Sequence, residues 1–284
     1  MNSTATANPG TVGGFSETSL DSYQRGRNEP EWLAERRRQS FERFRSFSWP
    51  ALRDEEWRRT DIRAFKLDTF SPSAAHVEPS AEARAAIGRA WETLAESYGA
   101  ESGILHLNGV AIRSPETKLP GGALFIDLNR AVKECPELLQ KSLMTEAVKS
   151  SDDLFAALHG AFWTGGTLLY VPRGVRIETP LFSLNGLANE GTVDLGHTLV
   201  ILEEGAEATL VQETAGLGRG TAPGLHIGAI EIIQEKGSHL RFVNIQNWDS
   251  STWHFSRDRA LVGRDASLQW TIGGLGGRLA KVNQ

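Results

Sequence analysis

The feature that most constrains the fold of this chain is a repeat in its second half. Four short β-rich runs, at 168–171, 198–202, 229–233 and 259–262, each lead into a turn that contains Gly174, Gly205, Gly237 or Asp265. A second β-rich run follows each turn, at 175–177, 208–211, 240–245 and 268–272. The turn residues are 31, 32 and 28 positions apart. Such a period predicts a β-solenoid, because one strand-turn-strand unit cannot bury its apolar face until a neighbouring coil stacks on it.

The last unit also shows the alternation of a strand with one buried face. Leu268, Trp270 and Ile272 point to one side, and the polar residues between them point to the other. Two face-packed antiparallel sheets are the alternative architecture for short strands of this kind.

The first 165 residues have mainly helical patterns. Pro30 stands at a helix start, where its missing N–H costs nothing, and Leu33, Phe41 and Phe44 recur on one face of the helix that follows. Further helices are predicted over 80–98, 129–143 and 152–162, and the Asn-Gly pair at 108–109 predicts a short hairpin. We expect an α+β chain: a disordered leader over 1–24, a mainly helical region over 25–165, and solenoid coils over 166–284.

Composition limits the classes of function. The chain carries 35 acidic and 30 basic side chains, with a net charge of -5, which argues against a broad basic surface for nucleic acid or anionic membranes. No apolar stretch reaches the roughly 18 residues that a membrane helix needs. The first 14 residues lack the basic start and apolar run of a signal peptide. We therefore expect a cytoplasmic protein with no nucleic-acid or membrane partner.

Candidate ligands for a metal are few. Cys135 is the one cysteine, so a disulfide within the chain and a zinc site of several thiolates are excluded. We interpret Cys135 as an incidental thiol rather than a cluster ligand. His226, His239 and His254 lie in the β-rich part without a short ligand spacing, and we interpret them as polar residues on strand faces. We expect no catalytic residue and no metal ligand in this chain.

Two features of the helical region have competing interpretations. The basic run Arg36, Arg37 and Arg38 is flanked by glutamates on the same helix, which favours a solvated, internally paired face over a phosphate site. Trp57 stands in a charged stretch, where it either anchors a partner or packs on the helices of its own region.

Four separated motifs resemble the SufB/SufD family of iron-sulfur cluster assembly scaffold proteins. They are EEWRRTD at 55–61, GGTLLYVPRGV at 165–175, EIIQEKG at 231–237 and QNW at 246–248. The resemblance runs from about residue 25 to the end of the sequence. It implies a helical N-terminal region, a right-handed parallel β-helix core and, in the family, a C-terminal helical domain that docks the ATPase SufC. It also implies a SufB-like scaffold subunit as partner, no cofactor held by this chain alone, and a transient iron-sulfur cluster at the level of the complex.

Individual positions favour the SufD type. SufB-type chains have a sulfur-transferring cysteine in the strand that matches LVQET at 210–214 of this sequence, and the place of that cysteine is taken here by Thr214. A hydroxyl cannot carry a persulfide. Gln246 and Trp248 match residues that line the core of SufB-type chains. The segments EWLAERR at 31–37 and VGRDASLQW at 262–270 are more similar to SufD-type chains. The resemblance thus points to Gln246, Trp248 and Thr214 as core positions of interest, and a SufB-type paralogue is the alternative.

Two expectations concern the whole protein. The sequence stops in a β-rich run, so we expect further coils and the SufC-docking helices to lie beyond residue 284 in the family pattern. A different class of function, a carbohydrate-active β-helix enzyme, needs clustered carboxylates on one exposed face. The carboxylates of the β-rich part, Asp194, Glu203, Glu204 and Glu213, are scattered over turns and strands, which makes this alternative the weaker one.

Overall fold

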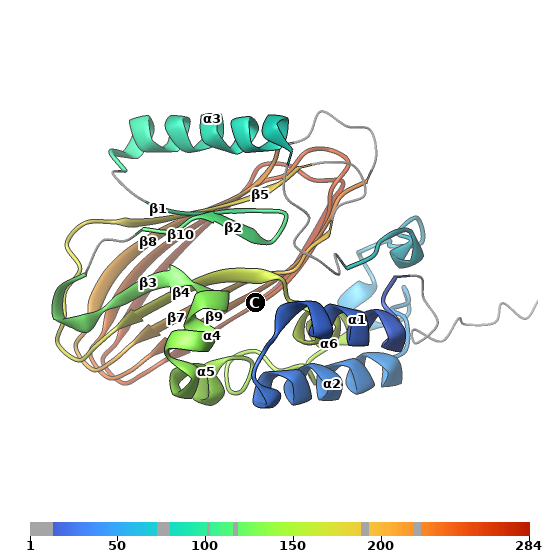
Figure 1. The fold of residues 1–284 in the computed structure, drawn as a ribbon, viewed down its shortest axis with the longest axis horizontal. Helices are drawn as coiled ribbons and strands as arrows, with labels where there is room; N and C mark the ends of the chain where they lie inside the picture. The colour runs from blue at the N-terminus through green and yellow to red at the C-terminus, as the bar shows by residue number, and fades with distance from the viewer. Residues whose placement is uncertain (1–13, 73–79, 101–102, 116–118, 189–192, 218–222) are drawn as a thin grey trace, which may run out of the picture.

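The computed structural model of the chain describes residues 14–72, 80–100, 103–115, 119–188, 193–217 and 223–284. Helices pack on the outer faces of both sheets of a parallel-strand solenoid of about four turns (Figure 1). The predicted class, helices followed by a β-helix-like solenoid, is therefore confirmed. No helix among the described residues is long and apolar enough to span a bilayer.

Six α-helices and thirteen strands make up the described part. The helices are α1 (Glu17–Arg27), α2 (Glu31–Ser46), α3 (Ala81–Tyr98), α4 (Leu128–Glu134), α5 (Pro136–Ser142) and α6 (Leu154–Phe162). The strands are β1 (Gly103–Leu107), β2 (Val110–Arg113), β3 (Leu124–Asp127), β4 (Gly165–Val171), β5 (Leu181–Leu187), β6 (Val193–Asp194), β7 (Gly196–Leu202), β8 (Glu207–Gly216), β9 (Leu225–Gln234), β10 (His239–Asn247), β11 (Trp253–Val262), β12 (Ser267–Gly274) and β13 (Leu279–Asn283).

The solenoid has two sheets, and successive coils add one strand to each. The first sheet has the order β12-β10-β8-β5-β1-β2, and the second has the order β13-β11-β9-β7-β4-β3. Neighbouring coils pair in parallel, whereas β2 and β3 close the sheets at one end by antiparallel pairing with β1 and β4. The alternative of two face-packed antiparallel sheets is thereby excluded.

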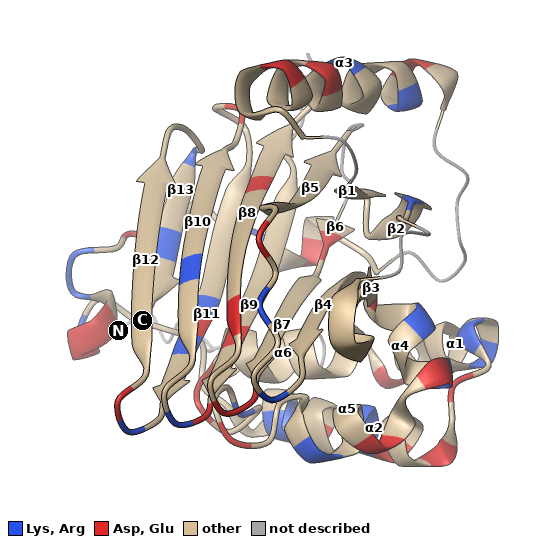
Figure 2. Cartoon of the chain, turned by 90° about the vertical axis from the view of Figure 1, so that its left-hand side faces the viewer, with Lys and Arg blue, Asp and Glu red and all other residues tan. Residues whose placement is uncertain are grey.

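The turns between the sheets repeat in conformation as well as in sequence. Gly174, Gly205 and Gly237 have φ of 67°, 70° and 67°, and Asp265 takes the same left-handed conformation with φ 59°. The amide of each turn glycine donates to the carbonyl just before the left-handed residue of the next coil, at 2.9, 3.0 and 3.0 Å. Charged residues gather along this edge of the solenoid, which we call the turn end (Figure 2). The period predicted from the sequence is thus the stacking period of these turns.

The second run of the first coil was predicted at the wrong place. Residues 175–177 do not form a strand, and Arg176 makes only an isolated bridge with Glu207. The strand that follows the Gly174 turn is β5, which begins at Leu181, directly after Pro180. Proline has no N–H to donate to a β-ladder, so pairing begins after it.

The predicted disordered leader over 1–24 is wrong for the part that the structure describes. Residues 1–13 lie outside the described residues, but α1 begins at Glu17 behind a capping box formed by Ser16 and Ser19. Tyr23 is buried, and its hydroxyl donates to the carbonyls of Phe162 and Trp163 at the end of α6. Helix α1 is therefore an integral part of the helical region, held by contacts with residues about 140 positions away.

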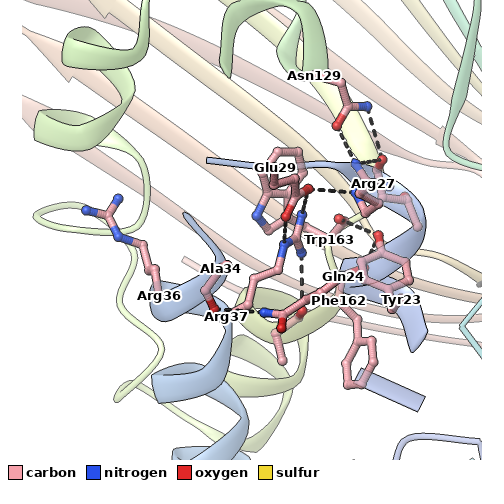
Figure 3. Close-up of polar contacts among 12 residues, drawn as sticks. Tyr23, Gln24, Arg27, Glu29, Ala34, Arg36, Arg37, Asn129, Phe162 and Trp163 are labelled. Carbon is pink, nitrogen blue, oxygen red and sulfur yellow. Dashed lines mark hydrogen bonds and ion pairs between the residues drawn. The ribbon is translucent and has the colours of Figure 1, made fainter. Parts of the chain in front are cut away.

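The basic run on α2 is not the solvated face that its flanking glutamates predicted. Only Arg38 is exposed and paired with glutamates of its own helix. Arg36 donates to the carbonyl oxygens of Leu143 and Gln140 at the end of α5. Arg37 is fully buried, forms two hydrogen bonds with Glu29 at 2.7 and 2.8 Å, and donates to Ala161 (Figure 3). The C-terminal carbonyls of neighbouring helices attract these guanidinium groups, because they carry the negative end of the helix dipole.

Three apolar clusters hold the molecule together. One lies between the helical region and the outer face of the second sheet, one fills the solenoid, and one lies between α3 and the outer face of the first sheet. Trp57 belongs to the first cluster and is 6% exposed, against Phe155 and Phe255. Of the two interpretations of Trp57, packing within the chain is the one that the structure supports.

Candidate functional site

The interior of the solenoid changes from apolar to polar along its strands. Close to the turn end, inward-facing residues such as Leu210, Ile232 and Phe242 form an apolar cluster. Farther from the turns, the inward positions are buried polar residues of both sheets, including Gln212, Thr214, Asn244, Gln246, His226 and His254. They surround a cavity of about 20 Å³, which we call the interior cavity. A space of this size accommodates a molecule no larger than water.

Thr214 and Gln246, two of the positions that the family resemblance singled out, are neighbours in this cavity. The register of β8 and β10 places Gln246 directly beside Thr214, and the register of β5 and β8 places Asn185 on the other side of Thr214. All three residues line the cavity. The Thr214 hydroxyl donates to the carbonyl of Ile245 at 3.3 Å.

Trp248, the third position, lies behind the cavity wall. It is 3% exposed, and its ring lies 4.8 Å from the ring of His226 and 5.7 Å from that of His254, centroid to centroid. Its indole nitrogen has no hydrogen-bond partner among the described residues. Trp248 therefore packs on two of the histidines that line the cavity without lining it itself.

His226 is held by a buried carboxylate. Its Nδ1 lies 2.9 Å from Oδ2 of Asp194, and the Thr164 hydroxyl donates to the other oxygen of Asp194 at 3.0 Å. The far side of the ring faces Gly228, where a Cβ atom would lie 2.7 Å from Nε2 of His226 and 3.0 Å from the Ser256 hydroxyl. A carboxylate at Nδ1 fixes the orientation of the ring. Glycine at position 228 keeps the space beside Nε2 free.

His254 and Asp258 are two further titratable groups of the interior. Burial, and next the neighbouring His226, hold the pKa of His254 well below its usual value, so this ring is neutral at pH 7. Neither nitrogen of His254 has a partner among the described residues. Burial raises the pKa of Asp258 to about 7, against the opposing effect of the hydrogen bond from Ser256. Both pKa shifts favour the neutral form, because burying a charge in the interior costs free energy.

A direct hydrogen bond joins the two sheets across this polar half. The Thr198 hydroxyl on β7 donates to the side-chain oxygen of Gln212 on β8 at 2.8 Å. Thr167 and Ser183 form a similar link one coil earlier, at 2.8 Å. Such links connect the two sheets directly beside the cavity.

The pairing of His226 with His254 was not apparent from their local spacing. The two histidines are directly opposite in the register of β9 and β11, and their rings stack at 4.9 Å. Residues one coil apart meet in a solenoid, so the signal in the sequence was the coil period itself. His239, by contrast, is exposed at the start of β10. Within the described ranges, no three or more His, Cys, Asp or Glu side chains are grouped to hold a metal ion.

The other candidate residues lie apart from the cavity. Cys135 joins α4 to α5, where its thiol donates to the Ala131 carbonyl and burial raises its pKa. Glu203 and Glu204 lie at the turn end, bound to Arg173, and Glu213 bonds to Asn247 on the outer face. The carboxylates considered for carbohydrate chemistry, Asp194 included, therefore share no common face.

Comparison with known proteins gives matches along almost the whole chain. The family model for the N-terminal region of SufBD proteins matches residues 23–182, and that for the SufBD core domain of the SUF system for iron-sulfur cluster assembly matches residues 184–284. An iron-sulfur cluster assembly SufBD family protein of Staphylococcus aureus (strain USA300) is 28% identical over 284 residues, covering 94% of this chain and 58% of the relative. A SufBD family protein of Staphylococcus saprophyticus is 28% identical over 283 residues, with the same coverage of 94% and 58%. The chain thus spans less than two thirds of the length of these curated relatives.

Proposed function

This chain belongs to the SufBD family of iron-sulfur cluster assembly proteins, and from that premise we propose that it is a SufD-type scaffold subunit without catalytic activity of its own. In this proposal it pairs with a SufB-like subunit and works with a SufC-like ATPase in the cytoplasm. A cluster forms transiently on the assembled complex rather than on this chain alone.

The observation that carries the choice of SufD type is the chemistry at Thr214. This position lies in the interior cavity beside Gln246. The family resemblance implies that a SufB-type chain has a cysteine for sulfur transfer at this place. The Thr214 hydroxyl is bonded to a backbone carbonyl, and it cannot form a persulfide. The one thiol of the chain, on Cys135, lies outside the solenoid with a pKa raised by burial, which lowers its thiolate content. A chain with no reactive thiol in its interior fits the partner of a sulfur-accepting subunit.

A SufB-type paralogue is the second candidate. Gln246 and Trp248 support it, because these two positions keep the side chains that the family resemblance associates with the core of SufB-type chains. A SufB-type role would require sulfur to be accepted elsewhere than at position 214. Carbohydrate chemistry has less support, since the carboxylates at Asp194, Glu203 and Glu213 share no face.

Co-purification tests the proposal. The tagged chain is co-expressed with a SufB-type and a SufC-type protein, and we expect it to retain the SufB-type subunit through gel filtration. The chain is also incubated with a cysteine desulfurase and cysteine, and persulfide is measured by mass spectrometry, where we expect none. A chain that stays solitary beside both partners contradicts the scaffold proposal, and a persulfide on Cys135 contradicts the SufD assignment. The SufB-type protein, treated in the same way, serves as the positive control for persulfide formation.

A further inference from the structure

The hydrogen bonds that cross the solenoid interior join side chains at matching positions of successive coils. We call such a bond between the two sheets a cross-sheet link. On the first sheet, the register of β5, β8 and β10 aligns Ser183, Gln212 and Asn244. On the second sheet, the register of β4, β7 and β9 aligns Thr167, Thr198 and Ile230. By register, the third pair across the interior is therefore Asn244 and Ile230.

The cross-sheet link is made in the first two of these coils and interrupted in the third. The side chains of the first two pairs are joined by hydrogen bonds of 2.8 Å in both cases. The side chain of Ile230 has no atom that donates or accepts a hydrogen bond. The side-chain oxygen of Asn244 is buried and has no partner among the described residues. A buried amide oxygen without a partner is costly, because folding has removed it from water.

The interior cavity lies at this interruption. Asn244 and Ile230 both line it, together with Gly196 and Gly228, which contribute no side chain to fill the space. The cavity has a volume of about 20 Å³, and on the same measure one water molecule needs roughly 10–15 Å³. A polar cavity of this size takes one water molecule and excludes a larger guest.

His254 is a second cavity residue whose polar atoms lack partners. It lies on β11 of the second sheet and lines the same cavity as Asn244 of the first sheet. Both of its nitrogens are buried, and neither has a partner among the described residues. Burial keeps the pKa of this ring well below its usual value, so the ring is neutral, with one N–H group and one bare nitrogen.

The guest that suits these groups is small, uncharged and able both to donate and to accept. The amide of Asn244 has a donor and an acceptor end, and the neutral imidazole of His254 has one of each. Water can pair with either end of the amide and with either nitrogen of the ring, whereas an ion of similar size would be a charge buried in the interior. The Asp258 carboxyl, which is beside Ile230 in the register of β9 and β11, is bonded to Ser256 and does not line the cavity.

We propose that the interior cavity is a binding site for one water molecule, which forms hydrogen bonds with Asn244 and His254. Because these residues belong to different sheets, the water supplies the cross-sheet link that Ile230 interrupts. The three coils are then joined across the interior in turn, twice by side chains directly and once through water. A bound water of this kind is part of the structure and is costly to remove.

A high-resolution crystal structure of the unmodified chain tests the site directly. We expect electron density for one water molecule within hydrogen-bond distance of both the Asn244 side chain and a nitrogen of His254. An empty cavity, or a water bound to only one of the two residues, overturns the proposal. Neither result depends on whether the chain assembles with a SufB-like subunit.

Oxygen-17 magnetic relaxation dispersion tests the site in solution, because it counts water molecules held inside a protein for longer than its tumbling time. Asn244→Leu keeps the approximate size of the side chain but removes the amide, and we expect the count to fall by one. Asn247→Leu makes the same change at an exposed position of the same strand and is expected to keep the wild-type count. An unchanged count in Asn244→Leu overturns the proposal.

Discussion

The imidazole of His254 stacks on that of His226 one coil away, with their centroids 4.9 Å apart and their planes inclined by 24°. The two rings differ in their support, because His226 is bound to Asp194 whereas neither nitrogen of His254 has a partner among the described residues. The pair shapes a small polar space, and the following prediction concerns that space.

Gly228→Ala is expected to destabilise the solenoid by about 1–3 kcal/mol, as overpacking of a rigid interior does. The added Cβ would lie 2.7 Å from Nε2 of His226, a ring that Asp194 holds in place. Denaturant unfolding measures the effect. Gly88→Ala in α3 is the control: no atom lies within 4 Å of its Cβ, and we expect a gain of about 0.5–1 kcal/mol. Equal effects of the two substitutions would show that the space beside His226 is not confined.

Asp258→Asn is expected to change how stability depends on pH. The pKa of Asp258 is about 7 in the folded chain against 3.8 for an ordinary aspartate side chain, so the native state binds more protons than the unfolded state between these values. Stability therefore falls as pH rises from about 4 to about 7, by on the order of 3 kcal/mol. Asparagine stays neutral, so the variant should lack this decline. Unfolding measured from pH 5 to pH 8 compares the slopes.

Two outcomes are informative for Asp258. The exposed carboxylate variant Asp21→Asn should keep the wild-type slope between pH 5 and pH 8, since Asp21 is on the solvent side of α1. If Asp258→Asn also keeps that slope, the proton is not bound at Asp258.

The solenoid could be predicted from the sequence because each coil needs a residue with a left-handed backbone at its turn, and these residues recur with the coil period. Gly174, Gly205 and Gly237 adopt a left-handed turn, and Asp265 was correctly placed as the fourth member of the series. The environment of Arg37 could not be predicted in this way. Its burial depends on the C-terminal end of α6, more than 120 residues away. The residue pattern of α2 does not indicate that contact. The contact between His226 and His254 was likewise not predicted, because the two residues lie on neighbouring coils and have no short ligand spacing along the sequence.

Substitutions at the turn residues of two neighbouring coils are expected to change the stability of the chain in opposite directions. Gly237→Ala is expected to cost about 1 kcal/mol, because a Cβ is disfavoured at φ 67°. Asp265→Gly is expected to be stabilising by a few tenths of a kcal/mol, since glycine relieves the left-handed strain but loses more entropy on folding. No atom lies within 4 Å of a Cβ at position 237, so the difference is a backbone effect. Thermal unfolding of both variants checks the signs, and a destabilised Asp265→Gly would contradict the conformational argument.

The two arginines Arg37 and Arg38 provide the sharpest contrast between sequence pattern and structure. Arg37→Ala is expected to destabilise the chain by about 3 kcal/mol, because it leaves the buried Glu29 with Arg27 as its remaining partner and the carbonyl of Ala161 without a donor. Arg38→Ala removes an exposed pair with Glu31 and should change stability by no more than about 0.5 kcal/mol. Chemical denaturation of both variants measures the difference. Arg37→Lys keeps the charge but cannot form the two parallel bonds with Glu29, so it should fall between them. Similar stabilities for Arg37→Ala and Arg38→Ala would mean that α2 presents a uniformly solvated basic face, as its sequence alone suggested.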